Sequence, residues 1–358
     1  MAPGPRNTER AWYGSRLYEI RGRPAPLSPG YHVLLNPSRL RRILERERPD
    51  VIELGSIYLA PWVLRVAARG MRIPTVGFFH LDLAGAVLRT LARRWPRAAR
   101  GAMRGMISAY LRSAYAGCNL VLGASEASLQ AMAGAGIAKG RLAPFGVDLE
   151  TFHPDRRDPA WKAEVGVPGR PVALFVGRLT REKNLPVMLG ALPRLHARFG
   201  LTLVLIGNGG WRPALQAMAA QHPERLVVLP FEPEPVRLAR AYASADVYVA
   251  TSPHETFGLS AMEAAACGLP VVGAAGGALD ERLTGAAWAR LVPAGEPAAW
   301  ADAAGSLLEA GHGVRAAARQ AATGFGWDRT FDTLVEIYRA AITEGAHGAR
   351  AGARKRRQ

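Results

Sequence analysis

Short apolar runs alternate with longer amphipathic stretches along almost the whole chain, and this alternation is the strongest constraint on the fold. The longer stretches of the first half have helical length and begin at Pro37, Pro61, Ala84 and Glu126. Apolar runs of strand length occupy residues 51–56, 75–80, 119–125, 142–147, 172–177, 203–207, 226–230, 246–251 and 270–274. Strands that are apolar on both faces and separated by helices are typical of parallel sheets covered on both sides. The sequence therefore predicts an α/β protein with two doubly wound, Rossmann-like sheets.

A polar, proline-rich stretch near the middle of the chain divides these runs into two groups. A length of 358 residues is enough for two domains at about 150 residues each. We therefore expect an N-terminal domain at residues 1–150, a linker at 151–170 and a C-terminal domain at 171–326. An amphipathic helix is expected at residues 327–344 and a basic disordered tail at 345–358. Two doubly wound sheets in tandem place a ligand cleft between them, outside the C-terminal ends of the strands.

Positive charge is concentrated in the first half of the chain. The formal net charge is +17, and residues 1–148 contribute roughly +13 of it. Such a balance suits a polyanionic partner, either nucleic acid or the anionic face of a membrane. A helix over the most basic region separates its arginines from its apolar side chains. One side carries Arg89, Arg93, Arg97, Arg100 and Arg104, and the opposite side carries Leu88, Leu91, Trp95, Ala102 and Met106. A core helix with a solvated basic face, a membrane-surface helix and a nucleic-acid-binding helix all fit this pattern.

The sequence favours a protein that stays in the cytoplasm. Its first ten residues hold charges and prolines where a signal peptide needs an apolar run, and its longest uncharged stretch, residues 264–279, is interrupted by glycine and proline. The two cysteines, Cys118 and Cys267, exclude a disulfide scaffold and a cysteine-based zinc cluster. We expect a soluble protein that attaches peripherally to the inner face of the cytoplasmic membrane.

Two stretches of the second half supply groups suited to a diphosphate. In FVGRLTREKN a strand ends at Gly177 and delivers Arg178 and Lys183 to the following loop, where two cations can neutralise phosphate. Two solvated loop charges would give the same pattern. In LVLIGNGGWRP a strand precedes Asn208, Gly209 and neighbouring glycines, which permit either close approach of the backbone to phosphate or a simple chain reversal.

The most informative stretch is SPHETFGLSAMEAAACGLPVV, in which Glu255 lies in a turn and Glu263 lies eight positions later in the next helix. The helix opening between them offers free N–H groups to an anion; it consists of Thr256, Phe257, Gly258 and Leu259. Bound phosphate would repel Glu255 unless that side chain faced sugar hydroxyls, and Glu263 can accept hydrogen bonds from a ribose diol. The alternative is an N-cap acid followed by an ordinary acid on the helix surface.

As a set, these motifs resemble the C-terminal half of the retaining GT-B glycosyltransferases, and within them the family 4 mannosyl- and glucosyltransferases of bacteria. GVDLETFHP at residues 146–154 and FGWDRTFDTLVEIYR near the end of the chain also look like the family pattern. The resemblance covers residues 36–343 and is strongest between residues 171 and 281. It implies a GT-B fold, in which an acceptor-side N-terminal domain faces a C-terminal domain that binds the nucleotide sugar.

The resemblance also implies a role for each residue. Arg178 and Lys183 would neutralise the leaving diphosphate, Glu255 would contact the donor sugar, and His80, at the end of TVGFFH and shortly before Asp82, would lie near that sugar. Glu263 would hold the nucleotide ribose, and the other expected donor contacts are Asn208, Gly209, Thr256, Phe257, Gly258 and Leu259. No Asp-x-Asp pair occurs in the sequence, so the leaving group is expected to be stabilised by the cations, without a metal or another cofactor.

Two features depart from the family pattern. Family members begin with a strand and a Gly-Gly loop, whereas the first strand expected here is at residues 51–56 and no such loop precedes it. We therefore expect an N-terminal domain that lacks about 40–60 residues. Asp280 also stands where the family usually has Glu. A catalytically impaired nucleotide-sugar-binding subunit is thus an alternative to an active enzyme.

The sequence as a whole predicts a retaining hexosyltransferase that moves mannose or glucose from a donor such as GDP-mannose or UDP-glucose. The basic first half indicates a lipid or lipid-linked glycan acceptor and an anionic membrane surface. A nucleic-acid binder would rest on charge alone, without a recognised module. A sugar-nucleotide epimerase is a further alternative, against which the HETFGLSAMEA stretch argues.

Overall fold

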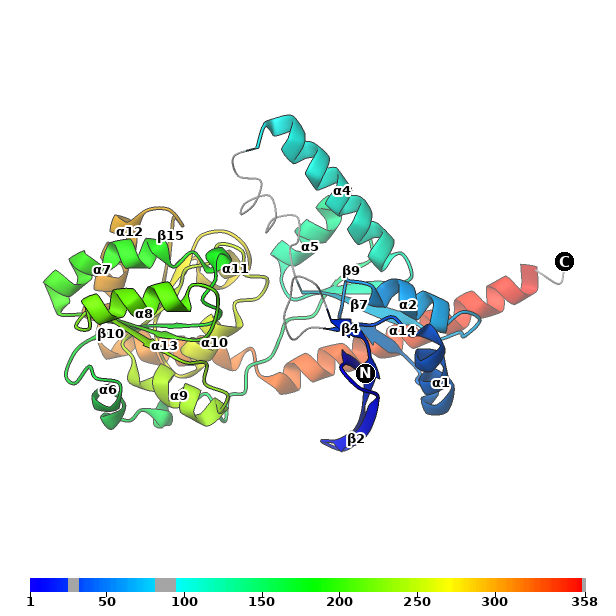
Figure 1. The fold of residues 1–358 in the computed structure, drawn as a ribbon, viewed down its shortest axis with the longest axis horizontal. Helices are drawn as coiled ribbons and strands as arrows, with labels where there is room; N and C mark the ends of the chain where they lie inside the picture. The colour runs from blue at the N-terminus through cyan, green and yellow to red at the C-terminus, as the bar shows by residue number, and fades with distance from the viewer. Residues whose placement is uncertain (25–31, 81–94, 356–358) are drawn as a thin grey trace.

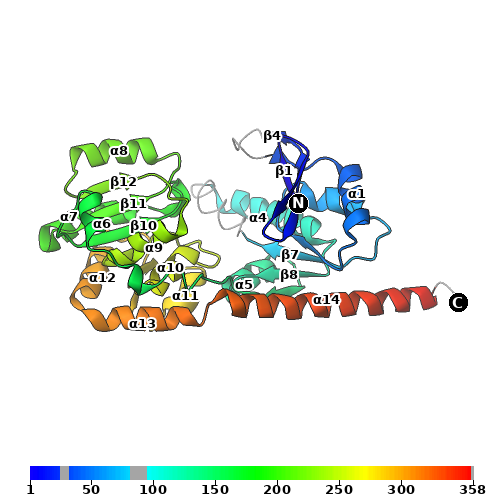
Figure 2. The same ribbon diagram turned by 90° about the horizontal axis from the view of Figure 1, so that it is seen from below.

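Two α/β domains lie side by side in the computed structural model, which describes residues 1–24, 32–80 and 95–355 (Figure 1). The N-terminal and C-terminal halves of the chain each form one domain, and the last helix returns along the N-terminal domain (Figure 2). Each domain contains a parallel sheet with helices packed against it. The predicted α/β class with two Rossmann-like sheets is confirmed.

The C-terminal domain is built on a six-stranded parallel sheet in the order β12-β11-β10-β13-β14-β15. Its strands consist largely of Val, Leu, Ile and Ala, because side chains on both faces are buried. The strand order reverses between β10 and β13, and at such a switch point the loops after the two strands diverge and leave a crevice. The strands are β10 (Val172–Val176), β11 (Thr202–Ile206), β12 (Leu226–Leu229), β13 (Val247–Ala250), β14 (Val271–Ala274) and β15 (Ala289–Val292).

Helices connect these strands and cover both faces of the sheet. α7 (Pro186–Phe199) packs on α12 (Pro297–Glu309), and α10 (Leu259–Ala266) packs on α13 (His312–Thr323). Several of them begin with proline at the first helical position, where the missing N–H has no intrahelical partner to lose. The remaining helices of this domain are α8 (Arg212–Gln221), α9 (Pro235–Ser244) and α11 (Ala278–Leu283).

The N-terminal domain contains a four-stranded parallel sheet in the order β6-β7-β8-β9. Two of its helices have side-chain caps: Asn36 Oδ1 accepts from the N–H of Arg39 at 2.9 Å, and Ser125 Oγ accepts from the N–H of Ser128 at 3.1 Å. The elements are β6 (Ile52–Leu54), β7 (Thr75–Phe79), β8 (Leu120–Gly123), β9 (Gly140–Leu142), α1 (Pro37–Glu47), α2 (Ala60–Ala67), α4 (Arg97–Tyr115) and α5 (Glu126–Gly134).

Strands also precede β6, so the prediction that the first strand lies at residues 51–56 was wrong. β3 (Ser15–Arg21) pairs in parallel with β1 (Ala2–Gly4) and antiparallel with β2 (Thr8–Trp12), and β4 (Arg23–Pro24) pairs with β5 (His32–Val33). These strands form small sheets of their own, separate from the four-stranded sheet. Sequence reasoning missed them because β2 is largely exposed and β3 sends only alternate side chains, Tyr18 and Ile20, into the core.

The structure differs from the prediction at residues 142–147 of this domain. A strand was expected at residues 142–147, but β9 ends at Leu142, and Val147 instead forms an isolated bridge with Gly326. The apolar run after Leu142 is buried against the other domain, which explains the misassignment. The helix expected from Ala84, together with Leu88, Arg89, Leu91, Arg93 and Asp82, lies outside the described residues.

The stretch at residues 151–170, predicted to be a linker, is folded onto the C-terminal domain. It contains a 3₁₀ turn (Pro154–Arg156) and α6 (Ala160–Glu164), and Trp161 and Val167 are buried in that domain's core. Lys162 Nζ also lies 2.7 Å from Asp246 Oδ2. The polar residues that suggested a linker therefore make ion pairs with the domain.

The last helix, α14 (Trp327–Lys355), runs beneath the sheet of the N-terminal domain (Figure 2). The Tyr338 hydroxyl donates a hydrogen bond to the Glu53 carboxylate beside β6, and this contact ties the helix to that domain. The helix continues in the structure through Lys355, beyond residue 344, where the amphipathic helix was predicted to end. Within the described parts of the chain, the length and apolarity needed to cross a bilayer are not combined in any helix.

Candidate active site

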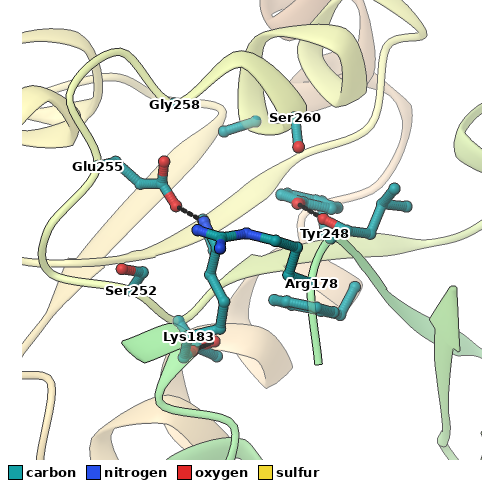
Figure 3. Close-up of a pocket in the computed structure, with 13 residues that line it drawn as sticks. Arg178, Lys183, Tyr248, Ser252, Glu255, Gly258 and Ser260 are labelled. Atoms are coloured by element: carbon teal, nitrogen blue, oxygen red, sulfur yellow. Dashed lines mark hydrogen bonds and ion pairs between the residues drawn. The ribbon is translucent and has the colours of Figure 1, made fainter. Parts of the chain in front are cut away.

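Arg178 and Lys183 follow β10 at the switch point of the C-terminal sheet, and both line a cavity of about 180 Å³ (Figure 3). Glu255, which follows β13, lines the same cavity from the opposite side. The structure thus brings together two cations and an acid that are far apart in the sequence. Other polar or small residues in the lining are Tyr248, Ser252, Gly258 and Ser260.

Lys183 and Glu255 form an ion pair inside this cavity. Lys183 Nζ donates to Glu255 Oε1 at 2.6 Å, and the two side chains are 22% and 25% exposed. Because both charges are partly removed from water, their attraction is screened less than that of a surface pair. In this structure the two side chains neutralise each other's charge.

The backbone around Lys183 is fixed by the loop after β13. The Thr251 hydroxyl donates to the Lys183 carbonyl, and Ser252 Oγ donates to the Glu182 carbonyl at 3.2 Å. Asn184 follows in the left-handed region, at φ 52°, and its side-chain amide donates to the Ala294 carbonyl at 2.7 Å. Asn tolerates this conformation better than most residues do. These bonds hold the Lys183 side chain at the mouth of the crevice.

Arg178 lies at the junction of two cavities. Its side chain is 71% exposed and pairs with Glu182 at 3.2 Å. Besides the smaller cavity, it lines a second cavity of about 640 Å³ whose other walls come from the N-terminal domain. That wall is mainly apolar and includes Leu40, Ile52, Leu54, Leu59, Leu64 and Tyr110. Arg178 therefore lies between the cavity that holds Lys183 and Glu255 in one domain and an apolar cavity in the other.

The glycine-rich turn after β11 packs against the Arg178 segment. A Cβ on Gly207 would lie 1.9 Å from the Gly177 carbonyl oxygen, and one on Gly209 would lie 2.3 Å from that of Leu179. Asn208, whose Oδ1 accepts from Arg212 at 2.8 Å, and Gly209 do not line the cavity. In this structure the glycines hold the Arg178 backbone close, and donor contacts from Asn208 and Gly209 remain a prediction.

The loop that precedes α10 presents backbone to the cavity and side chains to the other domain. Gly258, at φ 81°, is the N-cap residue of α10 and lines the cavity, so the helix N-terminus with its free N–H groups points there. The Phe257 side chain is buried and contacts the Phe145 ring edge-on at 5.4 Å. Thr256 Oγ1 donates to the His80 carbonyl at 3.2 Å. Leu259 is the first residue of α10 and is 40% exposed.

Glu263 lies deeper than the ribose contact expected for it. It does not line the cavity, and its Oε2 accepts a hydrogen bond from the Tyr242 hydroxyl at 3.0 Å. Burial raises the pKa of Glu263 to about 7, against the opposing effect of the Tyr242 bond. Its contact with a ribose therefore remains a prediction.

His80 directly follows β7, on the N-terminal side of the boundary between the domains. Its ring stacks on Phe78 at 4.3 Å and lies 5.9 Å from the parallel ring of Phe145. Partial burial lowers the pKa of His80, so the neutral imidazole is favoured. Through the Thr256 bond, His80 is tied to the loop that carries Glu255.

Some residues of the site were not predicted from the sequence. Tyr248, on β13, lines the cavity and donates its hydroxyl hydrogen to the Val176 carbonyl at 3.2 Å. Ser252 and Ser260 line it as well. The position of Tyr248 and Ser252, in the strand and loop at the switch point, could have marked them as site residues. Single hydroxyl-bearing residues form no recognisable motif, however, so the sequence did not single them out. Asp280, noted as unusual, accepts from the N–H of Gly276 at 2.8 Å and so stabilises the turn before α11.

Two family profiles match the chain in the order of its domains. The profile described as "Glycosyltransferase Family 4" matches residues 1–151, and the one described as "Glycosyl transferases group 1" matches residues 170–310. A GDP-mannose-dependent alpha-mannosyltransferase of Mycobacterium tuberculosis is 30% identical over 339 residues, covering 94% of this chain and 85% of that protein. A D-inositol 3-phosphate glycosyltransferase of Nocardia farcinica is 40% identical over 227 residues, covering 59% of this chain. The match spans 49% of that relative, about half its length.

Solved structures share the fold at lower identity. Sucrose-phosphate synthase from Thermosynechococcus elongatus superposes with a TM-score of 0.75 at 20% identity, covering 94% of this chain and 85% of that one. Anabaena HepE in complex with UDP gives 0.71 at 19% identity, covering 90% and 85%. Both likenesses concern the arrangement of two Rossmann-like domains. With a relative at 30% identity matched over 85% of its length, and with both family profiles matched in order, the chain belongs to the family 4 glycosyltransferases, enzymes of the GT-B fold that use nucleotide sugars.

Proposed function

We propose that this protein transfers a mannosyl or glucosyl unit, with retention at the anomeric carbon, from a nucleoside-diphospho-sugar to a lipid or lipid-linked acceptor. The observation that carries the proposal is the position of Arg178 between the cavity of Lys183 and Glu255 and the larger apolar cavity. The M. tuberculosis relative is named for GDP-mannose, so GDP-mannose is the first donor to test. UDP-glucose is the second.

The diphosphate of the donor is proposed to lie between Lys183 and the N-terminus of α10. Lys183 brings a full charge, and the free N–H groups after Gly258 add the positive end of a helix dipole. Arg178, largely exposed, can turn toward the same oxygens. Negative charge that develops on the leaving group is then stabilised by fixed groups of the protein. We propose that these groups suffice without a metal ion.

Glu255 is proposed to exchange partners when the donor binds. In the structure its carboxylate accepts from Lys183. Once Lys183 turns to phosphate, the carboxylate is left free to accept hydrogen bonds from hydroxyls of the donor sugar. His80 lies across the domain boundary and would face the same sugar, while retention, with the leaving phosphate helping to deprotonate the acceptor, rests on the family resemblance.

An apolar acceptor is proposed because of the chemistry of the larger cavity. Its walls are mainly leucine, isoleucine, valine and tyrosine side chains, and its polar groups include Glu53 and Ser56, with Arg178 at the side of the donor. A polar head group near Arg178 and a hydrocarbon part along the leucines would match this distribution. Burial of hydrocarbon there would supply binding energy of about 25 cal/mol per Å².

Association with an anionic membrane surface is part of the proposal, and α4 supports it. If the predicted apolar side of this segment packed in the core, Trp95, which precedes α4, and Met106, which lies within it, would be buried, but they are 45% and 61% exposed. Arg97 and Arg104 are exposed on the other side of the same helix. Apolar and cationic side chains on one projecting helix (Figure 1) suit an interface of anionic lipid head groups.

The test is sugar transfer by the purified full chain. Radiolabelled GDP-mannose and UDP-glucose are incubated with a polyprenyl phosphate or a glycolipid extract, and labelled lipid is measured, with the anomeric configuration read by NMR. Lys183→Ala and Glu255→Ala are expected to abolish transfer, while Lys139→Ala, which removes an exposed lysine elsewhere, is expected to leave it unchanged. Nucleotide binding without transfer or donor hydrolysis would contradict the proposal and favour a binding subunit.

A further inference from the structure

α11 of the C-terminal domain reaches across to the N-terminal domain through two adjacent side chains, Glu281 and Arg282. Glu281 accepts two hydrogen bonds from the first turn of α5, from the N–H of Ala127 to Oε1 at 2.7 Å and from that of Glu126 to Oε2 at 3.1 Å. A carboxylate from one domain therefore caps a helix of the other, where it also meets the positive end of the helix dipole.

Arg282 makes the second connection and is almost completely enclosed, with its side chain 6% exposed. Its Nη2 donates to the Ala124 carbonyl of the N-terminal domain at 3.3 Å, and its Nη1 donates to the Ala278 carbonyl at 2.8 Å. The guanidinium carbon also lies 4.3 Å from the centre of the Phe257 ring. A buried cation in this position is retained at a cost in desolvation, which points to a defined task.

From Arg282 a line of ring contacts continues to His80. Phe257 meets Phe145 edge-on at 5.4 Å, and Phe145 lies parallel to the His80 ring at 5.9 Å. Two hydrogen bonds from side chains to the backbone accompany these contacts: Thr256 Oγ1 donates to the His80 carbonyl at 3.2 Å, and Ser128 Oγ donates to the Thr256 carbonyl at 3.3 Å. The loop that carries Glu255 is thus held against both α5 and the end of β7.

The start of α11 also holds Glu255 itself. The N–H of Ala278 donates to the Glu255 carbonyl at 2.9 Å, and a Cβ on Gly277, which has φ 81°, would lie 2.8 Å from the same oxygen. Glycine is required there by both the backbone angle and the close approach. One short helix therefore contacts the Glu255 backbone at its beginning and the N-terminal domain at residues 281 and 282.

We propose that Glu281 and Arg282 are positioning residues for sugar transfer: they clamp the two domains so that His80 faces the Glu255 loop. The inference rests on the proposed function. Among the residues that the structure describes, those lining the smaller cavity all belong to the C-terminal domain, so a loosened clamp is expected to leave binding of a nucleoside diphosphate intact. Transfer needs groups from both domains in one geometry, so the same loosening is expected to slow it.

The experiment compares Glu281→Gln, Glu281→Ala and Arg282→Met with Glu309→Gln. Glu309 pairs with Arg198 at 2.6 Å within the C-terminal domain and serves as the matched control. We expect kcat for transfer to fall at least tenfold in Glu281→Ala and less in Glu281→Gln, whose amide oxygen can still accept one bond. The Kd for GDP or UDP by calorimetry is expected to stay within twofold of wild type. Glu309→Gln is expected to match wild type in both.

A second readout measures the clamp without activity. Dyes on Ser113→Cys in α4 and Gln216→Cys in α8, both exposed positions, report the distance between domains by energy transfer, while Cys118 and Cys267 are buried. A broader distance distribution in Glu281→Ala is expected. Unchanged kcat with an unchanged distribution would overturn the clamp, as would a Kd that weakens in proportion to kcat. If wild type transfers no sugar, the proposed function fails and the distance measurement alone decides the clamp. If Arg282→Met does not fold, Glu281→Gln still tests the clamp.

Discussion

Replacing Glu255 by Gln is predicted to tighten binding of free nucleoside diphosphate while slowing sugar transfer. In the structure Lys183 Nζ lies 2.6 Å from Glu255 Oε1, so a diphosphate must compete with this carboxylate for the lysine and is repelled by it. Gln has nearly the same shape but carries no charge. Its amide competes for Lys183 far less and leaves the ammonium available to the phosphate.

The size of the effect follows from the geometry. A hydrogen bond between charged groups contributes about 1.5–3 kcal/mol, and exposure of 22% and 25% for the two side chains moves the value toward the lower end. Release of about 1–2 kcal/mol corresponds to roughly 5–30-fold tighter binding. The donor gains less than free GDP or UDP, because the carboxylate that would bind its sugar is gone.

Calorimetric titration of GDP and UDP into wild type and Glu255→Gln measures this difference. The expected result is a lower Kd for both diphosphates in the variant, together with a transfer rate at least tenfold below wild type. Glu309→Gln, which removes an acid of a surface ion pair, is expected to change neither quantity. An equal or higher Kd in Glu255→Gln would show that the ion pair does not occupy the diphosphate site, and the reasoning would fail.

Three further predictions concern stability, the glycine-rich turn and the membrane. Because burial raises the pKa of Glu263 to about 7, its charge destabilises the folded state as pH rises from its ordinary pKa of 4.5 toward 7. Glu263→Gln is therefore expected to stabilise the protein by up to about 3 kcal/mol more at pH 8 than at pH 5, which appears as a larger rise in melting temperature at pH 8. An equal shift at both pH values in thermal denaturation would contradict this. Gly207→Ala places a Cβ 1.9 Å from a backbone oxygen beside Arg178 and is expected to cost about 2 kcal/mol or more in urea unfolding, whereas Gly210→Ala, with no atom within 4 Å of its Cβ, is expected to be nearly neutral; similar costs would show that the turn is not tightly packed. Charge reversal at Arg97, Arg100 and Arg104 is expected to abolish flotation with vesicles rich in phosphatidylglycerol, and persistence of flotation would place the membrane contact elsewhere.

The C-terminal domain could be predicted from local patterns because each of its signals is contained in a short stretch. β10, β11, β13 and β14 are apolar on both faces, and each predicted run lies within about one residue of the observed strand at either end. The loops with Arg178, Lys183 and Glu255 follow such strands, so their meeting at one edge of the sheet follows from the parallel topology.

What the sequence did not reveal depends on contacts between distant segments. β2 and β3 bury few side chains, so no apolar run marks them. The polar stretch at residues 151–170 looked like a linker because the partners of its charges, such as Asp246 for Lys162, lie far along the chain. The burial of Glu263 behind Tyr242 arises only when two elements are packed together. The same holds for the bonds from Glu281 to α5 and from Arg282 to the Ala124 carbonyl.

The central claim is that Lys183 binds the diphosphate of the donor within the cavity that it shares with Glu255. The most direct measurement is calorimetric titration of GDP-mannose and UDP-glucose into Lys183→Ala, with Lys139→Ala as the control for removal of a lysine. A lost charge-assisted hydrogen bond of about 1.5–3 kcal/mol predicts roughly 10–150-fold weaker binding of the preferred donor in Lys183→Ala, and wild-type affinity in Lys139→Ala. Donor affinity in Lys183→Ala equal to that of wild type would contradict the account.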